Sequence, residues 1–268
     1  MVGTPLGNPG DLSPRARACL ESADLVLAED TKREGLACAR WGVNVRRFLS
    51  YHDHNEKEKA ASVLELLREG KNIALISDAG MPVMADPGYV VIRACREAGL
   101  PVSVIPGPCA PVTALAGSGI PPQPFTFFGF LPRKRADQER TLAPYASIPV
   151  TLVFFERKDR LEETLKHALA LLGPREVCVA RELTKTHEEY LRFRLENMPD
   201  LSGILGEVTV ILGPPEDDAR SSREDILALI DEERPLGGAP RAVARRVQSR
   251  ARGWTTGEIY ALISDTKH

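Results

Sequence analysis

The chain has 268 residues, of which 43% are hydrophobic and 27% charged, and its formal net charge is −2 at pH 7. This composition supports buried cores and excludes a chain that is disordered throughout. No stretch approaches the roughly 18–20 apolar residues that cross a bilayer, and the first residues lack a basic segment followed by an apolar one. The sequence therefore predicts a soluble, cytoplasmic protein with no membrane partner.

Predicted strands and helices alternate along most of the chain, which is typical of βαβ units and a largely parallel sheet. Ser13 and Pro14 provide an N-cap and a first helical position for a helix that reaches about Ser22. Further helices are predicted over 56–69 and 160–172, where apolar residues recur at helical spacing and a glycine follows. The predicted strands cover residues 25–28, 47–51, 73–77, 102–105, 126–130, 151–155, 177–181 and 208–212.

The first loop, residues 3–8, has the composition of a strand-to-helix turn, yet only Met1 and Val2 precede it. Two explanations remain open. Either this strand is minimal, or residues before Met1 are missing.

Prolines and polar residues mark two boundaries. The densest proline cluster, residues 121–124, separates two regions that each alternate strands with helices. A polar segment that includes 216–218 precedes a part with no strand pattern. We therefore predict an N-terminal α/β domain over residues 1–120, a second α/β domain over 121–215, and a linker with a basic helical extension over 216–268.

The five cysteines are dispersed and show no C-x-x-C spacing, which argues against a disulfide framework and against structural zinc. We expect reduced, mostly buried thiols. His52 and His54 could share a metal ion with Asp53, but alternate residues of an extended segment point to opposite faces. The sequence thus predicts no metal site.

Positive charge is concentrated in two places although the net charge is negative. Residues 133–135 are all basic, and residues 234–252 contain six arginines and no acid. Such clusters can track phosphates. Taken alone, either cluster is more typical of a solvated helix face.

An apolar run at 73–76 ends in a turn of small residues, 77–80, that carries Asp78. In open α/β sheets, ligands bind beyond the carboxyl ends of the strands, where glycine allows close approach to the backbone. The same residue types also form ordinary turns. The chain contains no P-loop, no dinucleotide-binding glycine pattern and no nucleophile elbow. The loops therefore indicate noncovalent binding of a flat, polar small molecule.

Six motifs occur in the order and approximate spacing of one protein family. They cover residues 4–8, 28–31, 77–80 with 86–89, 106–110, 129–132 and 180–185. On these motifs the chain, from residue 3 to residue 213, resembles the ribosomal RNA small subunit methyltransferase I family of the tetrapyrrole methylase superfamily.

The resemblance implies 2'-O-methylation of a cytidine ribose in 16S rRNA, with S-adenosyl-L-methionine (S-adenosylmethionine) as methyl donor. It also implies two α/β domains of the tetrapyrrole methylase type with the cofactor in the cleft between them. The implied partners are 16S rRNA or the small ribosomal subunit, and a second copy of the chain in a homodimer.

Carried over position by position, the resemblance places nine residues at the cofactor. Small residues leave backbone groups free for the adenine and amino-acid ends, apolar side chains enclose the rings, and a carboxylate beside a sulfonium is electrostatically favourable. An alternative role for Asp78 is to cap the turn that follows it. The predicted cofactor-binding residues are Pro5, Asp78, Gly80, Met81, Cys109, Ala110, Phe155, Glu156 and Leu183.

Methyl transfer to a ribose hydroxyl is an in-line displacement, so catalysis depends on positioning and on the removal of one proton. Lys185, Glu182 and Glu29 are the candidate catalytic residues, and Asp30 is a further candidate for the proton. Glu182 and Lys185 are alternatively a surface pair at helical spacing.

In this interpretation the basic clusters supply phosphate affinity that does not depend on base sequence. The chain departs from the family pattern at two places. Met81 stands where threonine is usual, and residues 155–161 lack a serine and a histidine, although Arg157 and Lys158 could contact phosphate there. The predicted RNA-binding residues are Arg133, Lys134, Arg135, Arg241, Arg245 and Arg246.

Two other functions fit the sequence. A tetrapyrrole methylase of the same fold would act on a porphyrinoid and would not need the basic extension. A non-catalytic module would keep the cofactor pocket without turnover.

Overall fold

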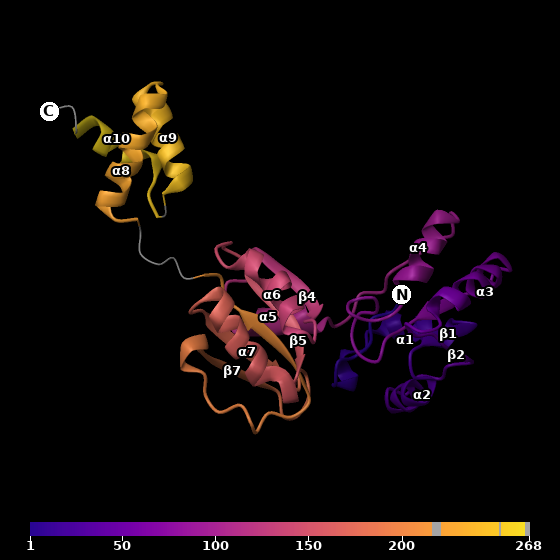
Figure 1. Ribbon diagram of the computed structural model, residues 1–268. Coiled ribbons are helices and arrows are strands. Elements are labelled where there is room, and N and C mark those ends of the chain that lie inside the picture. Colours follow the sequence, from indigo (N-terminus) through magenta and orange to yellow (C-terminus); the bar gives the residue numbers. More distant parts are fainter. Residues whose placement is uncertain (216–220, 252, 266–268) are drawn as a thin grey trace. The chain divides into compact units, whose positions relative to one another are not determined.

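The computed structural model describes residues 1–215, 221–251 and 253–265. It divides into two compact units, Met1–Pro214 and Pro215–His268, and each is described here by itself (Figure 1). The first unit contains two β-sheets with helices against them, and the second is helical. The α/β class with a helical C-terminal part is thus confirmed. The boundary at residue 120 stays a prediction, and the polar segment 216–218 and Arg252 lie outside the described residues.

The first sheet has three parallel strands in the order β2-β1-β3. Leu25 and Leu27 of β1 belong to one apolar cluster and Val26 and Ala28 to another. Both faces of the strand are therefore buried, which is why it is a continuous apolar run in the sequence. The strands are β1 (Leu25–Ala28), β2 (Phe48–Ser50) and β3 (Ile73–Leu75).

The start of the chain extends this sheet by a single bridge. The Val2 amide donates to the Leu75 carbonyl oxygen at 2.9 Å, and Val2 forms a parallel bridge with Ile105. In this structure the strand before the first loop consists of the Val2 bridge alone. The strand predicted at 102–105 is wrong except for its last residue, because its neighbour provides too few residues for a ladder and prolines flank it on both sides.

Four helices pack around the first sheet. Ser13 caps the first of them as predicted, because its Oγ accepts a hydrogen bond from the Ala16 amide at 3.1 Å. The helix predicted over 56–69 is also confirmed. The four helices are α1 (Pro14–Ser22), α2 (Thr31–Arg40), α3 (Glu56–Arg68) and α4 (Tyr89–Glu97).

The second sheet has five strands in the order β4-β5-β8-β6-β7, and only β4 and β5 are parallel. The expectation of a largely parallel sheet is wrong here. Residues 182–188 are too few for a crossover helix, so the chain turns back and pairs antiparallel. The strands are β4 (Phe125–Phe130), β5 (Thr151–Arg157), β6 (Glu176–Arg181), β7 (Glu189–Arg194) and β8 (Glu207–Leu212).

Helices cover this sheet and bury its side chains in two clusters. Helix α5 (Ala110–Ser118) contacts β5, β6, β7 and β8. One cluster includes Leu115 of α5, and the other includes Leu161 and Leu165 of α7 (Lys158–Leu172). Helix α6 (Arg135–Leu142) packs beside α7.

All five cysteines are free, and three of them, Cys38, Cys95 and Cys178, are buried, as expected. No helix within 1–215, 221–251 or 253–265 is long and apolar enough to cross a membrane.

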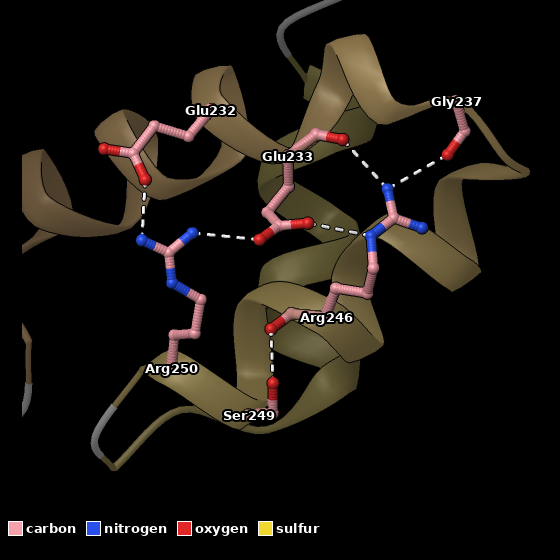
Figure 2. A network of polar contacts seen from close by, with 6 residues as sticks. All are labelled: Glu232, Glu233, Gly237, Arg246, Ser249 and Arg250. Atoms are coloured by element: carbon pink, nitrogen blue, oxygen red, sulfur yellow. Dashed lines mark hydrogen bonds and ion pairs between the residues drawn. The ribbon is translucent and has the colours of Figure 1, made fainter.

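The second unit contains α8 (Arg223–Glu233), α9 (Pro240–Arg250) and α10 (Thr256–Asp265) around a small apolar core. Glu233 of α8 is 7% exposed and accepts hydrogen bonds from Arg246 Nε at 2.8 Å and Arg250 Nη1 at 2.9 Å (Figure 2). Arg246 also donates to the carbonyl oxygens of Glu233 and Gly237. The hydrogen bonds that Arg246 and Arg250 donate to its carboxylate lower the pKa of Glu233. Part of the basic segment therefore joins α8 to α9.

We expect Arg246→Ala to loosen the packing of α9 on α8, because it leaves a Glu233 oxygen and two carbonyl oxygens without their donor. Amide hydrogen exchange should speed up several-fold in both helices. Arg245→Ala is the matched control, since Arg245 is exposed on the same helix. Equal exchange in the two variants would contradict a structural role for Arg246.

Candidate functional site

Backbone contacts hold three loops of the first unit together. The Thr4 amide donates to the Gly80 carbonyl oxygen at 2.9 Å, and the Gly80 amide donates to the Thr4 carbonyl oxygen at 3.1 Å. A Cβ atom on Gly3 would lie 2.7 Å from the Cα of Gly107, so only glycine allows this approach. The loop after Val2, the loop after β3 and the Pro-Gly turn at 106–107 therefore meet at one edge of the first sheet.

A cavity of about 580 Å³ lies at this meeting point. It is lined by residues of these loops and by residues at the ends of strands in the second sheet. All three predicted catalytic residues, Lys185, Glu182 and Glu29, line it. Six of the nine predicted cofactor residues also line it: Asp78, Met81, Cys109, Ala110, Phe155 and Leu183.

The other three predicted cofactor residues lie behind the lining. Pro5 is buried, and Gly80 is part of the backbone pair with Thr4. The Glu156 carboxylate is fully buried and accepts from Thr164 Oγ1 at 2.7 Å and from the Arg157 amide at 2.8 Å. The Glu156 side chain therefore faces α7 and not the cavity.

Asp78 is the acid at the centre of the cavity wall. Its Oδ2 accepts from Arg33 Nη1 at 2.5 Å, whereas its Oδ1 is buried and has no hydrogen-bond partner among the described residues. Because an unpartnered carboxylate oxygen is costly to bury, Asp78 Oδ1 is a favourable position for a hydrogen-bond donor or a cation. No turn-capping hydrogen bond to Asp78 is present among the described residues, in contrast to the alternative role.

Three further acids surround Asp78. Partial burial raises the pKa of Glu29, and the negative charges of Asp78 and Asp53 raise it further. Burial raises the pKa of Asp86 to about 6, although a hydrogen bond with Ser77 acts in the opposite direction. Asp53 and Asp86 also line the cavity. The sequence had suggested Asp53 only as a metal ligand beside His52 and His54, and Asp86 only as part of the motif at 86–89. In the described part of the chain, no group of three or more His, Cys, Asp or Glu is arranged to hold a metal ion.

Asp30, the further candidate for the proton, has a structural role. It is the N-cap of α2, and its Oδ1 accepts from the amides of Lys32 and Arg33, both at 3.0 Å. These hydrogen bonds lower the pKa of Asp30. Such a carboxylate is a poor proton acceptor.

Two loops beside the cavity hold non-glycine residues in the left-handed region. Val83 has φ 75° and Ala85 has φ 69° in one loop, and Glu182 has φ 50° and Thr184 has φ 64° in the other. Left-handed backbone is especially unfavourable for a β-branched residue such as Val83. Strain of this kind concentrates at binding sites, where surrounding contacts hold it in place.

The second of these loops closes against the first loop of the chain. The Asn8 amide donates to Thr184 Oγ1 at 3.0 Å, and Lys185 Nζ donates to Glu182 Oε1 at 3.0 Å. The Lys185 amide also donates to the Glu182 carbonyl oxygen, which makes this segment a turn and not a helix. Glu182 and Lys185 are thus an ion pair on the cavity wall.

The predicted RNA-binding residues differ in their surroundings. Residues 133–135 are exposed, and so are Arg241 and Arg245 on α9. Arg246, by contrast, is held by Glu233 and Gly237.

Comparison with known proteins shows which family has this architecture. Residues 1–199 match the family model described as Tetrapyrrole (Corrin/Porphyrin) Methylases. The solved structure titled "Crystal structure of the methyltransferase CobJ" superposes with a TM-score of 0.61 at 19% identity, covering 80% of this chain and 92% of that one. At this identity the superposition shows a common fold alone.

Curated relatives give a finer assignment. The chain is 48% identical over 189 residues to ribosomal RNA small subunit methyltransferase I of Escherichia coli O157:H7, covering 70% of this chain and 66% of the relative. It is 40% identical over 268 residues to the protein of the same name in Micromonospora olivasterospora, covering 97% of this chain and 85% of the relative. The chain belongs to the tetrapyrrole methylase family, and within it to the ribosomal RNA small subunit methyltransferase I family.

The chain is accordingly a methyltransferase that uses S-adenosylmethionine. The cavity fits this cofactor, because Asp78 offers an unpartnered oxygen to a positively charged group. Leu6, Phe155 and Leu183 offer apolar surface to its rings. Asp78 and these three side chains are the residues that would hold it.

One buried acid next to the site predicts a pH effect on stability. Glu34 of α2 is fully buried, and neither carboxyl oxygen has a partner among the described residues. Burial raises the pKa of Glu34 to about 8, and the charge of Asp78 raises it further. The folded state therefore retains a proton that the unfolded state loses above its ordinary pKa of 4.5. The contribution of Glu34 to the free energy of unfolding therefore falls as the pH rises from about 4.5 towards 8.

We expect Glu34→Gln to stabilise the protein relative to the wild type by roughly 3–5 kcal/mol near pH 8, because one pKa unit corresponds to about 1.4 kcal/mol. The gain should shrink towards pH 5, where the buried carboxyl is neutral. Urea unfolding at several pH values measures it, with Glu69→Gln at an exposed position as control. A difference between Glu34→Gln and wild type that does not change with pH would contradict the assignment.

Proposed function

We propose that this chain transfers a methyl group from S-adenosylmethionine to the 2'-hydroxyl of a cytidine in 16S rRNA of the small ribosomal subunit. The observation that carries the proposal is 40% identity along 97% of the chain to a relative named for that RNA. The cavity supports it, because groups suited to the donor and carboxylates suited to a proton face the same space.

The chain's own residues bind and orient the reactants. When bound, S-adenosylmethionine supplies a methyl group on a sulfonium, which an oxygen nucleophile can attack. Asp78 Oδ1 binds a positively charged part of the donor, and Arg33 fixes the Asp78 carboxylate in position. Phe155 and Leu183 exclude water from the apolar part of the cavity. Fixing the donor against the hydroxyl accounts for a large part of the rate.

The hydroxyl proton passes to a carboxylate of the cavity wall. Glu29 fits this role because its pKa is raised, so that it accepts a proton more readily than an ordinary glutamate. Lys185 and Glu182 form an ion pair on the same cavity wall and orient the ribose. Of the three candidate catalytic residues, Glu29 thus accepts the proton, and Glu182 and Lys185 position the ribose.

Basic side chains outside the donor cavity bind the RNA backbone. Arg133, Lys134, Arg135, Arg241 and Arg245 contact RNA phosphates, and Arg246 contributes by keeping α9 in place. The enzyme acts in the cytoplasm, where small subunits are assembled, and it acts as a homodimer.

Labelled S-adenosylmethionine incubated with small subunits, with naked 16S rRNA and with a porphyrinoid tests the substrate directly. We expect label in the RNA and, after ribose-methylation mapping, at a single cytidine. Glu29→Gln should slow transfer about 10²-fold or more while donor affinity stays unchanged. Glu58→Gln, an exposed residue of α3, is the control.

Other outcomes would select the alternatives. Label in the porphyrinoid and none in RNA would make the chain a tetrapyrrole methylase. Tight donor binding with no transfer to any acceptor would indicate a binding module without turnover.

A further inference from the structure

A second cavity, of about 240 Å³, lies between the loop after β4 and helix α7. Four cationic side chains line it, Arg133, Arg135, Arg160 and Lys166, against one acid, Glu163. Lys134, which lies between the first two in sequence, does not line it. The basic run at 133–135 is therefore split, with two residues at a cavity and one outside it.

The cations of this cavity differ in what they bind. Arg160 lies 3.3 Å from the Glu156 carboxylate, and Lys166 lies 2.6 Å from Glu162. Arg133 and Arg135 have no ion pair or hydrogen bond of their side chains among the described residues. Both arginines are exposed at the cavity and available to an anion.

The wall behind the arginines is fixed by buried polar groups. His167 is 6% exposed, and its Nδ1 lies 2.9 Å from Gln138 Oε1. Gln138 Nε2 and Arg160 Nη2 both donate to the Pro132 carbonyl oxygen, at 2.9 Å and 3.1 Å. His167 and Gln138 line the cavity, so polar groups there are already positioned before a ligand binds.

The first turn of α6 contributes free backbone amides, and its one acid, Asp137, pairs with Arg140. Arg135 is the first residue of this helix, and Lys134 at the N-cap makes no side-chain capping hydrogen bond. Helix N-termini favour anions, because free amides and the helix dipole point outward there. Two arginines, an uncapped helix start and a fixed polar wall together match a phosphate group.

The position of this cavity relates it to the methyl-donor cavity. Strands β4 and β5 are parallel, so their carboxyl ends lie at the same edge of the sheet. Phe130 at the end of β4 and Phe155 near the end of β5 line the donor cavity. Arg133 and Arg160 follow these two residues along the chain and line the basic cavity. The loop after β4 and the segment from the end of β5 to the start of α7 thus connect the two cavities along the chain.

We propose that this basic cavity is a subsite for one backbone phosphate of the RNA, next to the nucleotide that is methylated. The inference rests on the proposed function. It differs from general phosphate affinity because it assigns one particular phosphate to Arg133 and Arg135 at this cavity, which Lys134 does not line.

Two double variants that remove equal charge test the subsite. Arg133→Ala/Arg135→Ala empties the cavity of its unpaired cations, and Lys57→Ala/Lys71→Ala removes two exposed lysines to which no role in RNA binding is assigned. Binding of a fluorescent single-stranded fragment of 16S rRNA is measured against salt concentration. We expect the arginine variant to bind at least about tenfold more weakly, with a salt slope reduced by about 0.7 for one lost phosphate. The lysine variant should keep the wild-type slope.

The outcomes separate this inference from the proposed function. Calorimetry with S-adenosylmethionine should give wild-type affinity for both variants, which shows that each is folded. If the wild type methylates 16S rRNA and the two variants lose equal affinity, the subsite is wrong and the proposed function stands. If the wild type neither binds nor methylates 16S rRNA, both are overturned.

Discussion

The close approach of Gly3 to Gly107 is the constraint on which the rest of the site depends. A side chain at either position would place a carbon atom within 3 Å of the other backbone. With the paired hydrogen bonds between Thr4 and Gly80, this contact fixes three loops that are far apart in sequence. Asp78, Met81 and Cys109 reach one cavity because those loops are held together.

Negatively and positively charged side chains gather at different cavities. The donor cavity collects Glu29, Asp53, Asp78 and Asp86. Burial and the neighbouring carboxylates raise the pKa values of Glu29 and Asp86. The basic cavity, at the same edge of the second sheet, collects arginines that attract phosphate. In the proposed function, the arginines attract the RNA strand, and the acids inside the donor cavity serve the donor and the reacting hydroxyl.

Local signals in the sequence predicted much of the fold. Helix α1 was predictable from the Ser13 cap, and β1 from a run of apolar residues that both faces bury. Strand β7 was not predicted, because its alternation of apolar and charged residues marks an exposed edge strand that lacks a continuous apolar run. The direction of the strands in the second sheet depends on that missing element, so it could not be predicted either.

The sequence predicted those parts of the site that lie in recognisable loop motifs. Six of the nine predicted cofactor residues line the cavity, but the Glu156 side chain does not, because the strand's alternation turns it towards α7. The different environments of Arg245 and Arg246 depend on Glu233, which is 13 residues before Arg246 and comes close to it only when α8 packs against α9. Pairings of this kind are set by tertiary packing, which the sequence pattern does not reveal.

The most direct test of this account is the affinity for S-adenosylmethionine of Gly107→Ala, measured by calorimetry beside Gly35→Ala. Gly35 lies in α2, and a Cβ atom there would meet nothing within 4 Å. We predict at least about a tenfold loss of affinity for Gly107→Ala, as for the loss of one charged hydrogen bond, and wild-type affinity for Gly35→Ala. Wild-type affinity in a folded Gly107→Ala protein would contradict the claim that the close approach of these loops forms the cofactor site.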